Sequence, residues 1–239
     1  MMAAMHPFKI VPSLLSLAMS LSLLACGPSI NPAAKSDIDG RLARLSPTQT
    51  TFPAVPLFAP RPLLVGQWSQ VKSMDDKGQP SIHTYKIVGE SGGAYWFEVV
   101  NETYVGRTVT KMLIFFGDRA NPATMEIRSV KMKDKDGRIS EFDGPMISLM
   151  KSMWQGSLSM LTVSWQGLAQ EDAAVVAGTF AGCYKTRTDA NFGPFHAAAT
   201  TWSHPSVPIN GLVKSVGVDH PNSMELIAFS DTGAVSEIP

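Results

Sequence analysis

The sequence predicts a mainly β (α+β) domain of antiparallel strands with one main helix. Two patterns indicate this class. After residue 62, short runs rich in Val, Ile, Thr and aromatic residues alternate with Gly and Asp turns, as in a meander of antiparallel strands. One segment, residues 145–161, instead spaces its apolar residues as a helix does. We see no internal repeat and no second linker, so residues 63–239 are expected to form a single domain.

The strands are expected on both sides of the helical segment. A hairpin expected over residues 124–142 turns at Asp136-Gly137, a pair that accepts positive φ. The other expected strands cover residues 66–74, 83–90, 94–102, 108–118, 175–188, 194–203, 209–218 and 223–230.

The helix is expected to begin at Pro145, which suits a first helical turn, with Asp143 as its cap. Its apolar residues fall on one face. Methionine is flexible and polarisable and adapts to irregular apolar partners. The candidate lining of an apolar ligand site is therefore this face, with Met146, Met150, Met153 and Trp154. The alternative is that these side chains fill the core.

The N-terminal segment predicts export. Residues 10–25 are apolar apart from serines and follow Lys9, which fits a signal peptide over residues 1–25 and is short for a membrane-spanning helix. The segment ends Leu23-Leu24-Ala25-Cys26, which resembles the lipobox of bacterial lipoproteins. The resemblance implies cleavage after Ala25, a diacylglyceryl group on Cys26 and acylation of the new N-terminus with a chain such as palmitate. The alternative is an ordinary cleaved signal with a chance cysteine.

A lipid-anchored protein is expected in the cell envelope. Gly27 follows the cysteine instead of Asp, which favours the outer membrane of a Gram-negative bacterium, on either the periplasmic or the surface side. Residues 26–62 hold seven of the 17 prolines and are expected to form a tether, with a reach of up to about 100 Å if extended. Cys183 has no partner if Cys26 carries lipid, and is expected to be a small buried side chain.

Charge and motifs argue against several classes of function. The formal net charge is zero, so no nucleic-acid partner is expected. The histidines show no metal-ligand spacing, and neither a nucleophile-elbow motif nor a phosphate-binding loop occurs. We therefore expect no catalytic residue, metal or cofactor, and predict that the protein is not an enzyme.

His204 lies in the connection Ser203-His204-Pro205, between two expected strands. Pro205 disfavours a helical backbone conformation at His204, and Pro208 has no N–H to donate to a neighbouring strand. We interpret the segment as a stiff corner with His204 in solvent. The alternatives, a ligand contact or a catalytic residue, would need partners that the sequence does not show.

The lipobox, the proline-rich tether, the meander and the single mid-chain helix together resemble the LolA/LolB class of envelope proteins, with relatives such as LppX. The order from Trp202 to Lys214 is loosely similar to a strand, corner and strand near the end of such domains. The resemblance implies a strongly curved, incomplete barrel with its helix against the concave face, and lipid between the two. The resemblance does not assign a site role to any residue of this sequence.

Two functions follow as expectations. The first is a membrane-anchored, non-catalytic envelope lipoprotein that binds a lipid or another apolar ligand between sheet and helix. The second is a structural lipoprotein with a filled core that contacts an envelope protein partner. A hydrolase is a third class, and it requires a nucleophile and a base within reach of each other.

Overall fold

The first half of the sheet is a meander in which each strand pairs with the next one along the chain. The computed structural model describes residues 29–55, 61–118, 124–142, 144, 147, 168–192 and 195–239. The hairpin at Asp136-Gly137 is present as predicted. The strands of this half are β2 (Trp68–Met74), β3 (Pro80–Ser91), β4 (Ala94–Thr103), β5 (Gly106–Phe115), β6 (Glu126–Lys133) and β7 (Ile139–Phe142).

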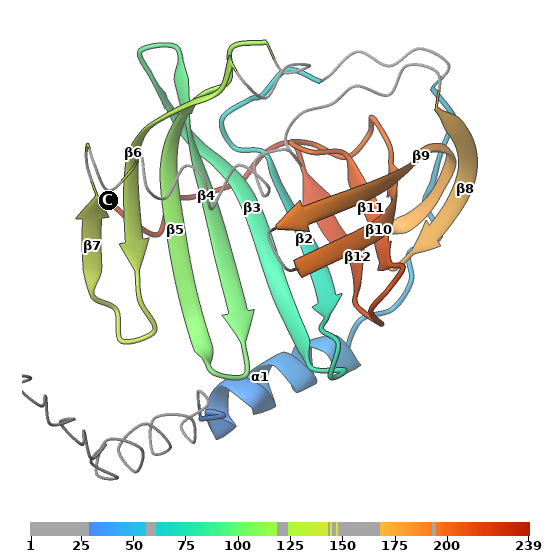
Figure 1. Ribbon diagram of the computed structural model, residues 1–239, viewed down its shortest axis with the longest axis horizontal. Helices are drawn as coiled ribbons and strands as arrows, with labels where there is room; N and C mark the ends of the chain where they lie inside the picture. The colour runs from blue at the N-terminus through green and yellow to red at the C-terminus, as the bar shows by residue number, and fades with distance from the viewer. Residues whose placement is uncertain are drawn as a thin grey trace, which may run out of the picture.

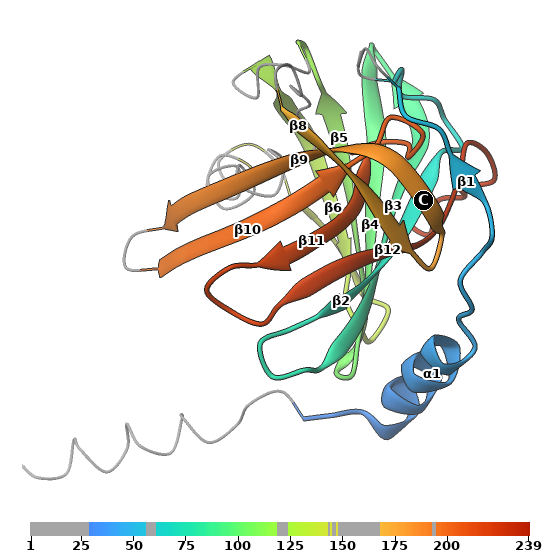
Figure 2. The same ribbon diagram turned by 90° about the vertical axis from the view of Figure 1, so that its right-hand side faces the viewer.

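The second half of the sheet continues from β2 and crosses the meander at a large angle (Figures 1 and 2). Its strands are β8 (Ala169–Val175), β9 (Gly178–Phe192), β10 (Phe195–Ser203), β11 (Leu212–Gly217), β12 (Ser223–Ser230) and β1 (Thr51–Phe52). The order across the 12-stranded sheet is β1-β9-β10-β11-β12-β2-β3-β4-β5-β6-β7, and β8 pairs with β9. The prediction of a mainly β, strongly curved sheet that does not close is confirmed.

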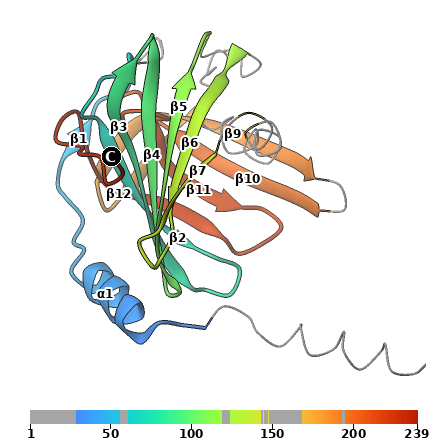
Figure 3. The same ribbon diagram turned by 90° about the vertical axis from the view of Figure 1, so that its left-hand side faces the viewer.

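The concave side of the sheet lies between the two halves (Figure 3). Apolar side chains of β3 to β6 form a cluster there, and Ile147 is buried in it. The helix predicted over residues 145–161 otherwise lies outside the described residues. A second apolar cluster lies between β2, β9, β11 and β12, and Tyr85 packs against both clusters.

The prediction that residues 26–62 form a tether was wrong for much of that length. Residues Pro32–Ala43 form helix α1, and β1 pairs with β9. Asn31 caps α1 by accepting hydrogen bonds from the N–H groups of Ala33 and Ala34. The helix has little apolar periodicity, and Ile38 is its buried residue. A cap and ion pairs stabilise this helix in place of an apolar stripe, so the spacing of apolar residues gives little indication of it.

The strand predicted over residues 175–188 corresponds to β9, which begins at Gly178 after a turn; β8, which ends at Val175, was not predicted. Val175 and Gly178 face each other across the β8–β9 hairpin. The turn between them, Val176-Ala177, has no Asn, Asp or Gly to mark it. It is fixed by contacts with β12, because the N–H of Ala177 donates to the carbonyl of Leu226 at 3.2 Å. Tertiary contacts here override the continuous apolar pattern.

Candidate functional site

Rows of side chains cross from strand to strand on the concave face of the meander. The row at the end away from α1 holds Tyr95, Ile114 and Ile127, and four further rows follow towards α1. Paired residues of neighbouring strands share a face, so the register defines each row. The first of these four rows lies deepest in the core and holds apolar side chains: Ile87, Phe97, Met112, Val130 and Phe142. The next row mixes apolar and hydroxyl side chains: Ser69, Tyr85, Val99, Thr110, Met132 and Ser140.

The two remaining rows approach the end of the sheet that carries α1. One contains Val71, His83, Asn101 and Thr108. The last contains Thr201, Ser215, Met224, Ser73 and Ser81. The four rows contain no Asp, Glu, Lys or Arg. From the first row to the last, the face therefore changes from apolar and buried to polar and partly exposed.

Several apolar side chains of this face remain partly exposed although they pack on the core. Tyr85, Val99 and Met132 share the second row and all have this intermediate burial. Burial raises the pKa of Tyr85 to about 12, so its hydroxyl stays neutral at physiological pH. Ser69, next to Tyr85, is fully buried, and its hydroxyl has no hydrogen-bond partner among the described residues. Open apolar surface beside an unsatisfied hydroxyl suits contact with a ligand more than a finished core.

The polar end of the concave face holds a hydrogen-bonded cluster. The imidazole of His83 lies 2.9 Å from Ser81 Oγ through Nε2 and 2.8 Å from Asn101 Oδ1 through Nδ1. Alternation along β3 puts Ser81 and His83 on one face, and the register places Asn101 opposite His83 on β4. All three side chains are partly exposed. Sequence reasoning did not single them out, because only the strand register brings Asn101 to the histidine.

The convex face of the same strands is charged and covered. Glu98 is fully buried and accepts hydrogen bonds from Lys86 Nζ at 3.0 Å, from Ser236 Oγ and from the N–H of Glu237. The side chain of Ile238 is buried against Val100 and Val109. Residues 234–239 thus form a strap across the convex face.

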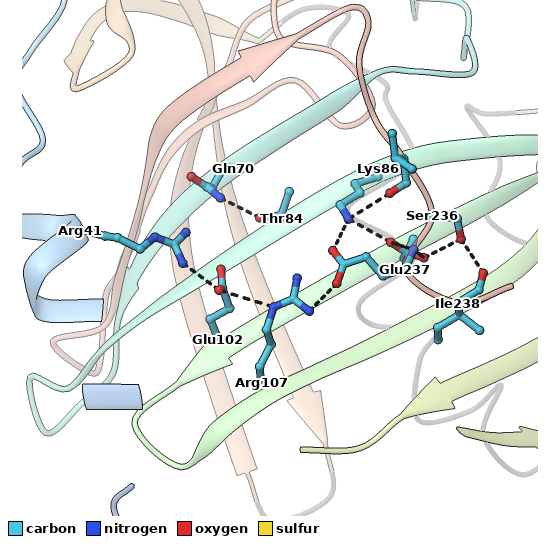
Figure 4. Close-up of polar contacts among 11 residues, drawn as sticks. Arg41, Gln70, Thr84, Lys86, Glu102, Arg107, Ser236, Glu237 and Ile238 are labelled. Atoms are coloured by element: carbon cyan, nitrogen blue, oxygen red, sulfur yellow. Dashed lines mark hydrogen bonds and ion pairs between the residues drawn. The ribbon is translucent and has the colours of Figure 1, made fainter. Parts of the chain in front are cut away.

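Helix α1 joins this network from the other end of the sheet. Arg41 donates to Glu102 at 2.7 Å, and Arg107 bridges Glu102 and Glu237 (Figure 4). Burial by itself would raise the pKa of Glu237, but hydrogen bonds from Arg107 and Lys86 outweigh it and hold the pKa at about 2. The convex charges therefore hold the strap and α1 on the sheet, and they leave no open charged site on the residues of this network.

His204 is a corner residue as predicted, but the prediction that it lies in solvent was wrong. It follows the end of β10, and its carbonyl accepts the N–H of Val207 in a turn. The side chain is fully buried. Nδ1 accepts the N–H of Ser206 at 3.1 Å, and Nε2 lies 3.2 Å from the carbonyl oxygen of Pro53, to which it donates. Burial lowers the pKa of His204, so the ring is a neutral structural link to the N-terminal segment.

The other predicted site residues have different outcomes. Cys183 is buried, and burial raises the pKa of its thiol to about 12, as expected for a structural cysteine. The lipid attachment residue Cys26 lies outside the described residues, as does the candidate lining, Met146, Met150, Met153 and Trp154.

Comparison with known proteins adds little. No family model matches the chain, and no curated protein matches it. Among solved structures, a protein from Bacteroides fragilis that is inferred to be exported and has a YmcC-like fold covers 71% of this chain and 97% of its own length. Its TM-score is 0.36 and its identity 13%, so the likeness carries no argument about function.

Two further findings concern the described residues alone. None of their helices is long and apolar enough to cross a membrane. No group of three or more His, Cys, Asp or Glu side chains among them is arranged to hold a metal ion.

Proposed function

We propose that this chain is a lipid-anchored, non-catalytic protein of the bacterial cell envelope, and that its concave face binds a lipid or another apolar chain. The observation that carries the proposal is the face itself. Its four rows contain no Asp, Glu, Lys or Arg, and Tyr85, Val99 and Met132 leave apolar surface partly open. Ligand sites are predominantly apolar with a few placed polar groups, which matches the change from apolar to polar along these rows.

The anchor on Cys26 would hold the domain close to the bilayer. The N–H of Asn31 donates to the carbonyl of Tyr104 at 2.8 Å, so the chain contacts the sheet already at residue 31. Five residue steps from Cys26 span at most about 18 Å. The first contact with the sheet thus lies within about 18 Å of the anchor, whereas an extended tether would reach about 100 Å.

This short connection supports one orientation of the domain. Helix α1 and the turns that join β2 to β3, β4 to β5 and β6 to β7 lie at the same end of the sheet (Figure 1). The polar rows of the concave face end there as well. In the proposed orientation this end faces the membrane, and an acyl chain entering from it would meet the polar rows first and the apolar rows beyond.

The test is native mass spectrometry of the full chain, purified from membranes in a mild non-ionic detergent. We expect noncovalent lipid in addition to the covalent anchor. Thr110→Glu places a charge in the second concave row and should remove this lipid. Ser129→Glu is the matched control, since Ser129 is also partly exposed but pairs with Leu113 on the convex face. Lipid absent from the native chain, or retained equally by both variants, would refute the binding proposal.

The anchor is tested separately. The variant Cys26→Ser should accumulate as an unlabelled precursor when cells are fed radioactive palmitate. Unchanged labelling of that variant would show that Cys26 is not the attachment site, without affecting the binding test.

One observation favours the second function, a structural lipoprotein with a protein partner. Leu64, Val65 and Val235 are 53%, 51% and 74% exposed. The hydrogen bond from Ala234 N to Gly66 O at 2.8 Å brings their two segments side by side. Cross-linking in cells should recover one stoichiometric envelope protein if this patch is an interface, and Val65→Asp with Val235→Asp should abolish recovery. A chain recovered alone argues against it.

A further inference from the structure

The cluster at the polar end of the concave face contains the single positively chargeable side chain of the four rows, His83. An amide oxygen only accepts hydrogen bonds, so the contact of 2.8 Å with Asn101 Oδ1 places a proton on His83 Nδ1. In the neutral ring, Nε2 then accepts the hydroxyl proton of Ser81 at 2.9 Å. In the imidazolium form, Nε2–H donates to Ser81 Oγ instead. That change releases the Ser81 hydroxyl proton to donate elsewhere.

A second donor flanks the ring on its other side. With Oδ1 engaged by His83, the Asn101 amide group Nδ2 keeps two N–H donors, and neither has a hydrogen-bond partner among the described residues. The charged cluster therefore offers a cation between two neutral donors, and both are partly exposed. A carboxylate has two acceptor oxygens and forms stronger hydrogen bonds than a neutral acceptor.

The order Ser, His, Asn also resembles the connectivity of acyl-transfer sites, but three features favour binding over catalysis. Asn101 carries no charge and cannot compensate an imidazolium as the carboxylate of a triad does. Ser81 lies in a regular strand instead of a strained turn. The β3 backbone pairs with β2 and β4 from Ile82 onward, so along this stretch it offers no pair of free N–H groups to an oxyanion.

The surroundings select an anion with an apolar body. No acidic side chain occurs in the four rows, so a carboxylate at His83 meets no like charge among them. From Ser81 to Ile87 the strand covers about 20 Å, and the side chains become progressively more apolar over that length. This length is comparable with that of an extended long acyl chain.

We propose that Ser81, His83 and Asn101 bind the carboxylate of a long-chain fatty acid whose chain lies along the apolar rows. The inference rests on the proposed binding of an apolar chain and names its chemical class. A charge-assisted hydrogen bond contributes about 1.5–3 kcal/mol, so the free acid should bind about tenfold or more tightly than its methyl ester.

The experiment is competition for a photoreactive fatty acid on the full chain in a mild non-ionic detergent. Hexadecanoic acid should displace the probe at about one-tenth of the concentration that methyl hexadecanoate needs. His83→Gln and Asn101→Leu should each bring the two concentrations close together while the ester value stays unchanged. His220→Gln, at an exposed loop histidine, should keep the native ratio. Unfolding midpoints of the variants verify that they fold.

The outcomes separate the two proposals. Equal displacement by acid and ester on the native chain, or a native ratio retained by His83→Gln, overturns the carboxylate site and leaves apolar binding intact. Absence of saturable labelling by the probe overturns both. Release of free acid from the ester that depends on Ser81 would show catalysis and also overturn the binding role.

Discussion

Side chains along the strands of the β2–β7 meander alternate between the concave and the convex face. The two faces differ in whether their buried polar groups have partners. On the convex face, buried charges such as Glu98 and Lys111 have polar partners in the strap, and α1 adds Arg41 at its edge. On the concave face, Ser69 is buried without a partner and Tyr85 is left partly open. The difference teaches that, among the described residues, the buried polar side chains closed off by the chain's own ends have partners, whereas the buried hydroxyl without one, Ser69 Oγ, lies on the proposed binding face.

The largest expected effect comes from breaking the convex network at its centre. Glu98→Leu leaves Lys86, Ser236 and the N–H of Glu237 without their shared acceptor, and should lower the free energy of unfolding by about 3–5 kcal/mol. Urea unfolding measures it. Glu126→Leu is the control, because Glu126 forms an exposed pair with Arg128 and should change stability by less than about 0.5 kcal/mol. Equal effects would show that the network does not hold the strap.

The strap should also respond to acid. The folded pKa of Glu237, about 2, lies below its ordinary value of 4.5, so its contribution is complete above about pH 4.5 and is lost as the pH falls towards 2. Amide hydrogen exchange of residues 234–239 should therefore accelerate over that window before the concave strands respond. Glu237→Gln should remove this step. A strap equally protected at pH 2.5 and pH 7 would contradict the assignment.

The smallest effect distinguishes two buried or half-buried serines. Ser236→Ala removes a hydroxyl that donates to the convex network, and should cost about 1 kcal/mol. Ser69→Ala removes a hydroxyl without a partner, and should be neutral or stabilise by up to about 1 kcal/mol. Thermal unfolding of both variants gives the comparison. A clear loss of stability in Ser69→Ala would mean that its hydroxyl has a structural role.

Sequence patterns predicted much of this fold because they act locally. Alternation and turn residues located the meander strands, and the strand over 223–230 has the predicted bounds. What the patterns missed depends on residues far apart in the chain. The burial of His204 needs the carbonyl of Pro53, and the β8–β9 turn needs Leu226. The Ser81–His83–Asn101 cluster likewise needs the register of β3 against β4, which no pattern in the separate strands specifies.

The most direct test of the concave binding face is residue-level mapping of a cross-linked ligand. A fatty acid with a diazirine on its chain would be bound to the full chain, irradiated, and located by mass spectrometry. We predict modification at Tyr85, Val99 and Met132, and none at their neighbours Lys86 and Val100, which face the other side. Modification on both faces, or mainly at convex residues, would contradict the account.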